Sequence, residues 1–468
     1  MLHAPNAPDT PGPSGAPRPA RRRRIAFAVA ATALTALWLV SGLTDRIGRF
    51  GPRPDRTFLY VLLILGYGLW VGLCVDRGRA KRLGRLAMLA VAAAALTLMH
   101  YAGTMRWLRG TTPWQRPDLV QWTAFTAQAA TLTGIFLVLA GLDVLVAWLV
   151  RRLVRLGPPG GHGSRRLDPR RLLVGLARIG ALYLVGLPWL FVFAQTHPGK
   201  FDYHDTPASA YECLDADIAG LAPCAGWPMP ADEPSDTVVL ICHGLGADQA
   251  NFLPYSAMFH EMGCHVVSFD LPGHGRGPGL ATTFGPAEAE LIGRIARWVR
   301  QHPQRFPGAP PGRLVGFGGS MGGTSLLLAA QREPGLFDAL IIDSAYATLE
   351  GEAEHHIGHL PSVVAWPVRH VGRWLLAWQI GQRVASVDAT RDMARLDGVP
   401  KLFLHCDRDR IVPAGQGRQL YESAGPPKRW VEFDCRRHQG GQIAEPGRYR
   451  AAVAELLRSA RTATSPGP

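Results

Sequence analysis

Two kinds of apolar pattern divide the chain near residue 196. Before it, five long apolar stretches occur, and a helix that crosses a membrane needs about 20 such residues. After it, short β-branched runs alternate with longer amphipathic segments. The first pattern predicts an α-helical membrane domain of about five transmembrane helices, and the second predicts an α/β domain with a mostly parallel sheet. The five stretches are Ile25–Leu43, Thr57–Val75, Leu86–Tyr101, Thr123–Leu149 and Ile179–Thr196.

The second half of the chain repeats a strand-then-helix order. Several of its short runs are continuously apolar, as expected for parallel strands that helices cover on both faces. This alternation favours an α/β sheet with right-handed crossovers. The predicted strands are Thr237–Cys242, His265–Phe269, Leu314–Phe317, Ala339–Ile342, Lys401–His405 and Trp430–Phe433, and the predicted helices are Asn251–Met262, Glu288–His302, Met321–Arg332, Ala414–Ala424 and Pro446–Ala460.

The first 24 residues show no apolar periodicity. Six prolines fall within the first 20 residues, and Arg21–Arg24 precede the first long apolar stretch. We expect residues 1–24 to be a disordered basic tail and residues 25–196 to be a multi-pass transmembrane domain. A basic segment before an apolar run is also typical of a signal peptide, which is the alternative for the first stretch.

The net charge is distributed unevenly between the two halves. Residues 1–200 hold 26 Lys and Arg against 7 Asp and Glu, whereas residues 201–468 hold 24 against 29, so the total of +14 comes from the first half. The basic residues cluster between apolar stretches, as in membrane proteins, which argues against a nucleic-acid partner. With a cytoplasmic N-terminus, 17 basic residues face the cytoplasm and 7 face away. This bias predicts a multi-pass protein of the cell (inner) membrane whose second half lies outside the cytoplasm.

A serine lies in a glycine-rich turn between a predicted strand and a predicted helix. The segment Gly318–Gly323 is GGSMGG, a G-x-S-x-G motif with Ser320 at its centre. Such a turn lifts the serine hydroxyl off the sheet, and small neighbours let the backbone approach closely. The following helix directs its first N–H groups toward the same place. We therefore predict Ser320 as a nucleophile.

A nucleophilic serine needs a base, and the base needs an orienting carboxylate. In sheets of this type both lie in loops after strands, in the chain order serine, acid, histidine. Asp409 follows the predicted strand Lys401–His405, and His438 follows the predicted strand Trp430–Phe433. We predict Asp409 as the acid, with Asp407 as the alternative, and His438 as the base.

The loops after the first two predicted strands contain further histidines and glycines. His243–Gly246 (HGLG) can aim a backbone N–H at the oxyanion that develops during acyl transfer. We predict the backbone N–H groups of Leu245 and Met321 as the oxyanion hole. The His243 ring is expected to be buried and to brace this loop, and Asp270–Gly275 (DLPGHG) is expected to be a structural turn.

Together these motifs resemble the α/β-hydrolase superfamily, and within it the branch of serine aminopeptidases and monoacylglycerol-lipase-like enzymes. HGLGA, DLPGHGRG, GGSMGG, IDSAY, DRDRIVP and the late His438 carry the resemblance over about Thr206–Ala460. It implies an α/β-hydrolase domain at residues 197–462 and the same nucleophile, acid and base. The chain departs from the pattern at His405-Cys406, where His-Gly is common, and at Arg436-Arg437, where a small residue is common. The arginine pair is either a solvated loop or a feature that favours an anionic substrate.

An insertion at about residues 347–392 separates two predicted strands. Its apolar helical stretch contains Trp366, Trp374 and Trp378, which predicts a helical cap over the active site. Tryptophan is favoured where membrane meets water, so the cap lies near the outer membrane surface in one interpretation. In the other, it packs on the sheet without lipid contact.

Six of the seven cysteines lie in the second half. An even number outside the cytoplasm permits disulfides. A hairpin turning at Asp217–Gly220 would place Cys213 opposite Cys224, which is the preferred pair. Cys406 and Cys435, which end neighbouring predicted strands, are a weaker pair, and free buried thiols are the alternative. We expect no metal and no cofactor, because no metal-ligand spacing or nucleotide-binding fingerprint occurs.

These observations predict a membrane-bound serine hydrolase that cleaves a small-molecule or lipid-like ester through an acyl-serine intermediate. An apolar cap and a membrane tether both suit acyl chains. A serine peptidase is the alternative among enzymes. A catalytically silent sensor or binding protein with the same fold, and a transporter fused to a hydrolase, are the alternatives of other classes; replacement of Ser320 distinguishes them from an enzyme.

Overall fold

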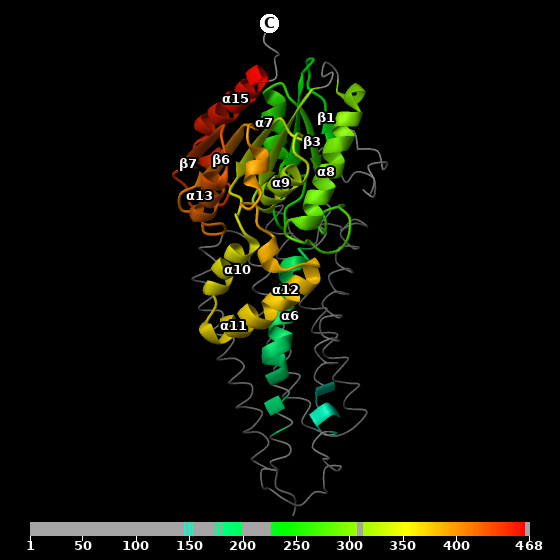
Figure 1. The fold of residues 1–468 in the computed structure, drawn as a ribbon, viewed down its shortest axis with the longest axis vertical. Helices are drawn as coiled ribbons and strands as arrows, with labels where there is room; N and C mark the ends of the chain where they lie inside the picture. The colour runs from blue at the N-terminus through cyan, green and yellow to red at the C-terminus, as the bar shows by residue number, and fades with distance from the viewer. Residues whose placement is uncertain are drawn as a thin grey trace, which may run out of the picture. The chain divides into compact units, whose positions relative to one another are not determined.

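The computed structural model describes residues 180–198, 226–306 and 312–463, together with isolated helical positions between residues 145 and 177. All of them belong to one compact unit, Trp114–Pro468. A central sheet lies between helices on its two faces, and a group of short helices lies at one end of the sheet (Figure 1).

Seven strands form this sheet in the order β1-β3-β2-β4-β5-β6-β7. Among these strands β1 alone is antiparallel to its neighbour, β3, and every other neighbouring pair is parallel. The carboxyl ends of β2 to β7 therefore meet at one edge, where sheets of this kind place their sites. The strands are β1 Gly226–Met229, β2 Thr237–Cys242, β3 His265–Phe269, β4 Arg313–Gly319, β5 Ala339–Asp343, β6 Lys401–Cys406 and β7 Lys428–Phe433.

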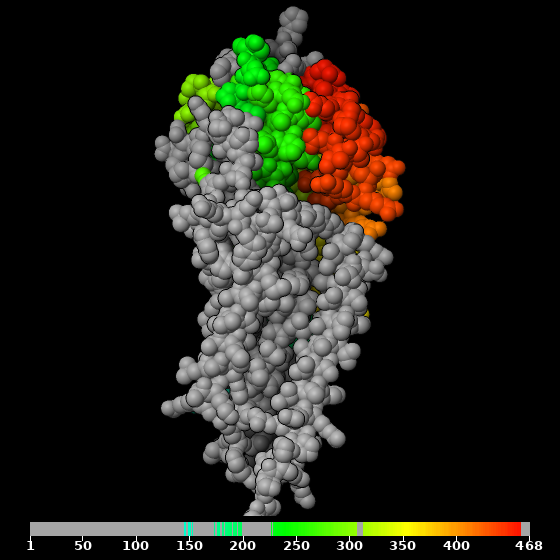
Figure 2. Space-filling model, turned by 180° about the vertical axis from the view of Figure 1, so that it is seen from behind, coloured from blue at the N-terminus to red at the C-terminus, as the bar shows by residue number. Residues whose placement is uncertain are grey.

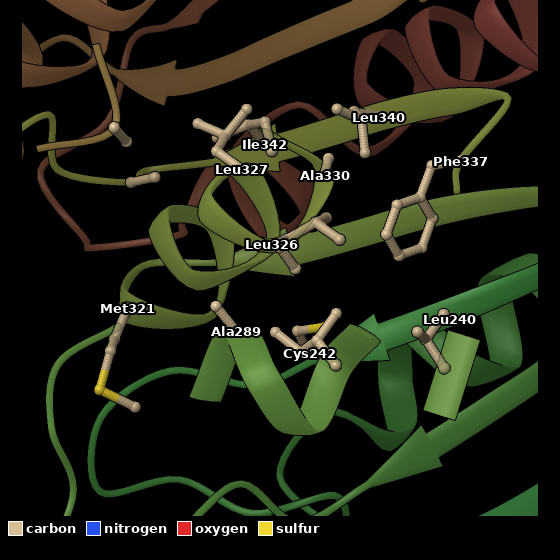
Figure 3. Close-up of a cluster of buried hydrophobic side chains, with 14 of the residues drawn as sticks. Leu240, Cys242, Ala289, Met321, Leu326, Leu327, Ala330, Phe337, Leu340 and Ile342 are labelled. Atoms are coloured by element: carbon tan, nitrogen blue, oxygen red, sulfur yellow. The ribbon is translucent and has the colours of Figure 1, made fainter. Parts of the chain in front are cut away.

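Side chains of the central strands alternate between two cores. On β2, Leu240 and Cys242 pack into the core beneath α8 and α9 (Figure 3), whereas Val239 and Ile241 pack into the core beneath α7 and α15. Both faces of β2 are buried, which explains why the strand is apolar throughout. Each such side chain contributes about 1.5–3 kcal/mol by burial. The flanking helices are α7 Leu253–Glu261, α8 Pro286–Gln301, α9 Met321–Arg332, α13 Ala414–Ser423, the short α14 Gly441–Ala444 and α15 Pro446–Ala463.

The helices α7 and α15 lie side by side on one face, although they stand far apart in the chain. Figure 2 shows the early segment of the domain (green) against the C-terminal segment (red). Arg450 of α15 pairs with Glu261 of α7 at 2.6 Å, and Tyr449 and Tyr255 share the core between them. This packing fixes the loop between β7 and α15, which carries His438.

The sequence predicted six of these strands and did not predict β1. That strand has four residues and contains Pro228, which has no N–H to donate to a ladder. It lies at the edge of the sheet and pairs with β3 alone. A short edge strand with a proline gives no apolar run, so the hydrophobic pattern could not reveal it.

The predicted fold class was wrong in its membrane part. Within the described residues, no helix has both the length and the apolar character that a membrane crossing requires. The fifth predicted span, Ile179–Thr196, contains a π-helical turn at Leu182–Gly186 followed by the ten-residue helix α6 (Leu187–Thr196). The first three predicted spans lie outside the described residues, and of the fourth only isolated helical positions from residue 145 onward are described.

The helix α6 packs on the segment predicted to form the cap. That segment contains α10 (Leu349–Gly358), α11 (Ser362–Pro367) and α12 (Arg373–Ile380). The π-helical turn Val368–Gly372 joins α11 to α12. Pro188 and Val192 of α6 approach Gly372 so closely that a Cβ there would lie 3.7 Å from both. The buried side of α6 therefore contacts protein. This contact explains the apolar pattern from which the sequence predicted the fifth span.

Candidate active site

The backbone holds Ser320 in the conformation that its motif predicts. Ser320 lies between β4 and α9 with φ 53° and ψ −125°, a region that residues other than glycine rarely occupy. Its N–H donates to the Asp343 carbonyl at 2.8 Å, and its own carbonyl accepts from the N–H of Gly323 at 2.9 Å. A Cβ on Gly322 would collide with the carbonyls that end β2, so the turn needs glycine at that position.

Asp409 and His438 meet across two loops. We name Asp407–Pro413, after β6, the acid loop and Asp434–Gly440, after β7, the base loop. Asp409 Oδ2 lies 2.7 Å from His438 Nδ1, and the Asp409 carboxylate is fully buried. Its other oxygen accepts from the N–H groups of Ile411 at 2.9 Å and Val412 at 3.2 Å. Partners on both oxygens hold the carboxylate in place, which suits a group that orients a histidine.

The free nitrogen of the predicted base has no partner in the structure. His438 Nε2 is buried and makes no hydrogen bond with any described residue, so the bond from Ser320 Oγ is not formed here. In structures without substrate such a bond is often open and closes when substrate binds. The arrangement leaves Nε2 as the acceptor available to a nearby proton.

Asp407, the alternative acid, has another set of contacts. Its Oδ1 accepts from the Cys435 N–H at 3.0 Å, and its Oδ2 lies 3.2 Å from Arg408 Nε. Its side chain is 37% exposed, whereas that of Asp409 is fully buried. The structure thus places Asp409, and not Asp407, against the predicted base.

His405 holds the acid loop by a hydrogen bond to its backbone, a role that the sequence did not predict. Its ring is buried, and Nε2 donates to the Val412 carbonyl at 2.9 Å while lying 3.9 Å from Asp409 Oδ2. Burial lowers the pKa of His405. A neutral ring in this position holds the loop without adding a charge beside the acid.

The loop after β2 passes directly over Ser320. A Cβ on Gly244 would lie 3.2 Å from the Ser320 Cβ, and Leu245 follows it. Met321, the other predicted oxyanion residue, is buried at the start of α9, where its N–H belongs to the first helical turn. Both predicted donors therefore belong to segments that adjoin Ser320.

Two buried histidines brace this loop, as expected for His243. The His243 ring donates from Nδ1 to the Gly244 carbonyl at 2.9 Å and accepts the Leu271 N–H on Nε2 at 2.9 Å. Burial lowers its pKa to about 4, so the ring is neutral. His274 Nε2 accepts the Gly246 N–H at 2.9 Å. These contacts agree with a structural role for the DLPGHG turn.

A buried carboxyl that the sequence analysis did not single out lies beside the nucleophile. Asp343 ends β5, where it accepts hydrogen bonds from Tyr449 Oη at 2.8 Å and Ser344 Oγ at 2.9 Å. Burial raises its pKa to about 6, against the opposing effect of these donors. The IDSAY run was the available signal, because an acidic residue at the end of a buried strand must have partners.

The cap segment is tied to the acid loop and carries exposed apolar side chains. His355 Nε2 of α10 donates to the Arg410 carbonyl at 2.9 Å, next to the predicted acid. Trp366, Trp374 and Trp378 are 51%, 67% and 70% exposed. Large apolar side chains gathered on one exposed segment mark a surface for an apolar partner or ligand.

The cysteines divide between described and undescribed parts of the chain. Cys406 and Cys435, the weaker predicted pair, form a disulfide. Cys213 and Cys224, the preferred pair, lie outside the described residues.

In residues 226–306 and 312–463, no group of three His, Cys, Asp or Glu side chains comes together as a metal site requires.

A mostly parallel sheet, a serine at a strand-to-helix turn and an acid–histidine pair at the same edge define an α/β-hydrolase domain, and the resemblance expected from the motifs is confirmed. Residues 233–399 match the family described as serine aminopeptidase, S33. A hydrolase is therefore the class of enzyme to which this part of the chain is related.

Curated relatives are distant. The chain is 24% identical to the uncharacterized protein YqkD of Bacillus subtilis over 237 residues, 50% of this chain and 75% of that protein. It is 24% identical to the lysophosphatidylserine lipase ABHD12 of Danio rerio over 233 residues, 48% of this chain and 56% of that protein. The chain thus matches little more than half the length of this lipase.

Solved structures include the esterase Pf2001 of Pyrococcus furiosus. Its similarity has a TM-score of 0.45 at 17% identity and covers 57% of this chain and 98% of that one. A monoacylglycerol lipase of Paleococcus ferrophilus has a TM-score of 0.38 at 19% identity and covers 50% of this chain and 98% of that one.

Proposed function

We propose that the domain is a serine hydrolase that cleaves a carboxylic ester of a lipid-like substrate. The observation that carries the proposal is the Asp409–His438 pair, in which Asp409 Oδ2 lies 2.7 Å from His438 Nδ1 at the sheet edge that presents Ser320. His438 Nε2 is buried and has no hydrogen-bond partner among the described residues. A structural histidine in a loop would have both nitrogens paired or exposed. A base needs one nitrogen oriented by an acid and the other free for the proton.

The reaction then proceeds in two acyl-transfer steps. Ser320 Oγ attacks the ester carbonyl, and its proton passes to His438 Nε2. The N–H groups of Leu245 and Met321 receive the oxyanion. The tetrahedral intermediate expels the alcohol, which takes the proton from His438, and an acyl-serine ester forms. A water molecule attacks this ester and gives a proton to His438. The acyl–oxygen bond of the second tetrahedral intermediate then breaks, Ser320 Oγ takes the proton back from His438 Nε2, and the carboxylic acid is released.

A lipid-like substrate is supported by the cap and by the relatives. The exposed tryptophans of α11 and α12 offer apolar surface on the cap segment, whose helix α10 contacts the acid loop. One relative is named a lysophosphatidylserine lipase and a structural neighbour is named a monoacylglycerol lipase. A single acyl chain esterified to a small polar head has the chemistry that such a surface accepts.

A serine peptidase is the second candidate, because the matching family is described as serine aminopeptidase, S33. The same nucleophile serves both reactions, and the leaving group differs. An amide nitrogen leaves only after protonation, so a peptidase must place its leaving group close to His438. Matched ester and amide substrates separate the two functions.

The test is turnover of p-nitrophenyl esters of rising chain length beside the p-nitroanilides of the same acids. We expect ester hydrolysis by the wild type, at least about 10³-fold less by Ser320→Ala, and little anilide hydrolysis. Ser423→Ala is the matched control, since Ser423 is exposed at the end of α13. Equal ester turnover in Ser320→Ala would contradict the proposal, and preference for the anilides would favour the peptidase.

We further propose that the domain works outside the cytoplasm. The Cys406–Cys435 disulfide supports this location, because structural disulfides persist in oxidising compartments. An alkaline phosphatase reporter fused after Pro468 should be active, since that enzyme needs export to fold. An inactive phosphatase in a fully expressed fusion would contradict this location.

A further inference from the structure

A disulfide joins the acid loop to the base loop. Cys406 is the last residue of β6 and Cys435 follows β7, and their Cα atoms are 5.0 Å apart. Each cysteine precedes a predicted triad member of its own loop by three residues, Asp409 in one loop and His438 in the other. Two chain segments of equal length, which we call the arms, thus lead from the disulfide to Asp409 and to His438.

Noncovalent contacts between the two loops are concentrated at this bond. The Arg408 N–H donates to the Cys435 carbonyl at 3.2 Å, and the Cys435 N–H donates to Asp407 Oδ1 at 3.0 Å. Past these residues, no backbone hydrogen bond joins the two loops in the described part of the chain. The next hydrogen bond between them is the Asp409–His438 pair itself. The Arg408 side chain also pairs with Asp434 of the base loop, so the disulfide and these neighbouring contacts are the links that precede that pair.

The two arms differ in how well they are held. Asp409 is fixed inside its own loop by the N–H groups of Ile411 and Val412. The ring of His438 has one hydrogen bond, to Asp409, because its other nitrogen has no partner. The backbone of the base loop is held on both sides of His438, by the disulfide at Cys435 and by Tyr255 Oη, which donates to the Gln439 carbonyl at 3.2 Å.

We propose that the Cys406–Cys435 disulfide is a positioning element of the acid–base pair, which holds the base loop so that His438 reaches Asp409 and Ser320 together. The inference rests on the proposed function. A displacement of about 1 Å in such a group costs about 10²-fold in rate, so loss of the bridge should lower kcat. Substrate binding at the cap does not involve the bridge, so KM should change little.

The experiment compares the wild type with Cys406→Ser/Cys435→Ser, using p-nitrophenyl butyrate as the probe. Each protein is checked by circular dichroism and thermal unfolding, and kinetics are measured well below the unfolding temperature. Cys264→Ala is the matched control, because Cys264 is buried in the core and is not part of this disulfide. The Asp409→Asn protein, with and without the serine pair, completes a double-mutant cycle.

We expect kcat to fall at least about tenfold in the folded serine-pair variant, with KM within about twofold. In the Asp409→Asn background the same change should lower kcat by less than about twofold, because the pair that the bridge positions is already broken. An unchanged kcat in the folded variant would overturn the inference. So would an equal loss in both backgrounds, since that is the result of a purely structural disulfide.

Reduction of the folded wild type gives the same test if the serine variant does not fold. Two thiols of dithiothreitol supply two electrons and two protons: the Cys406–Cys435 bond breaks, two cysteine thiols form, and dithiothreitol becomes its cyclic disulfide. Iodoacetamide then caps the thiols before the kinetic measurement. If Ser320→Ala and Asp409→Asn keep wild-type kcat, the proposed function fails. If they lose activity and the bridge variants do not, this inference alone fails.

Discussion

Asp343 is a buried polar residue of the sheet that lies next to Ser320. Its side chain is buried at the end of β5, while its backbone carbonyl accepts the Ser320 N–H. Tyr449 and Ser344 donate to its two oxygens. These donors only partly offset the desolvation of the charge, because burial still raises its pKa to about 6.

The first prediction concerns stability against pH. The folded pKa of Asp343, about 6, lies above the ordinary value of 3.8, so the folded state holds this proton more tightly than the unfolded state. The stabilisation is complete below about pH 4 and is lost as the pH rises to about 6. Relative to Asp343→Asn, the wild type should lose up to about 3 kcal/mol of unfolding free energy across this window.

Urea unfolding of both proteins at half-unit steps from pH 4 to pH 7 measures this difference. A constant difference between wild type and Asp343→Asn over the whole range would show that Asp343 does not titrate there. The comparison with the variant removes the contributions of other groups, such as His405, that both proteins share.

The second prediction separates the two aspartates of the acid loop. Asp409→Asn removes the carboxylate that faces His438, and we expect kcat to fall about 10³- to 10⁴-fold, as when a triad histidine loses its orienting acid. Asp407→Asn is the matched control, with an effect below about tenfold, because that carboxylate contacts Arg408 and the Cys435 N–H. Steady-state ester hydrolysis measures both. A larger loss in Asp407→Asn would reverse the assignment.

At the scale of elements, the junction of β4 and α9 depends on close backbone approach. A Cβ on Gly322 would meet the carbonyl oxygens of Cys242 and His243. We expect Gly322→Ala to cost at least about 2 kcal/mol of stability, because backbone atoms cannot move aside as a flexible side chain can. Gly415→Ala in α13, where nothing lies within 4 Å, should be neutral or stabilise by up to about 1 kcal/mol. Similar denaturation midpoints for the two variants would contradict this account.

The cap elements give a prediction about substrate chain length. Replacement of Trp366, Trp374 and Trp378 by Gln should leave the unfolding temperature nearly unchanged, because these side chains are largely exposed. The KM for a long-chain ester should rise at least about tenfold, whereas that for a butyrate ester should stay within about twofold, since only the long chain reaches this surface. Leu280→Gln, at another exposed apolar position, is the control. An equal effect on both esters would remove the cap from substrate binding.

The sequence predicted those elements whose pattern is local. Six strands, their flanking helices and the G-x-S-x-G turn follow from apolar runs and small residues at fixed spacing. The edge strand β1, the buried partners of Asp343 and the support of the acid loop by His405 depend on tertiary contacts. The Cys406–Cys435 pair was one of several open pairings, because sequence alone does not determine disulfide connectivity.

For the whole molecule, the apolar stretch that ends at Thr196 did not by itself distinguish a membrane span from a helix that packs on protein. The segment ending at Thr196 has the composition of a span, yet α6 buries Pro188 and Val192 against protein. The Thr196 carbonyl also accepts the Thr282 N–H at 2.8 Å, in a loop that contacts Met321. A helix that packs one side on protein can show the same hydrophobic pattern as a helix that faces lipid.

The central claim is that Ser320 is an activated nucleophile, and covalent labelling by a fluorophosphonate tests it most directly. The wild type, Ser320→Ala and Ser423→Ala are incubated with the reagent, and the modified peptide is located by mass spectrometry. The account predicts one phosphonyl group on the peptide that contains Ser320 in the wild type and in Ser423→Ala, and none in Ser320→Ala. Labelling of Ser320→Ala to the same extent, or no labelling of the folded wild type, would contradict it.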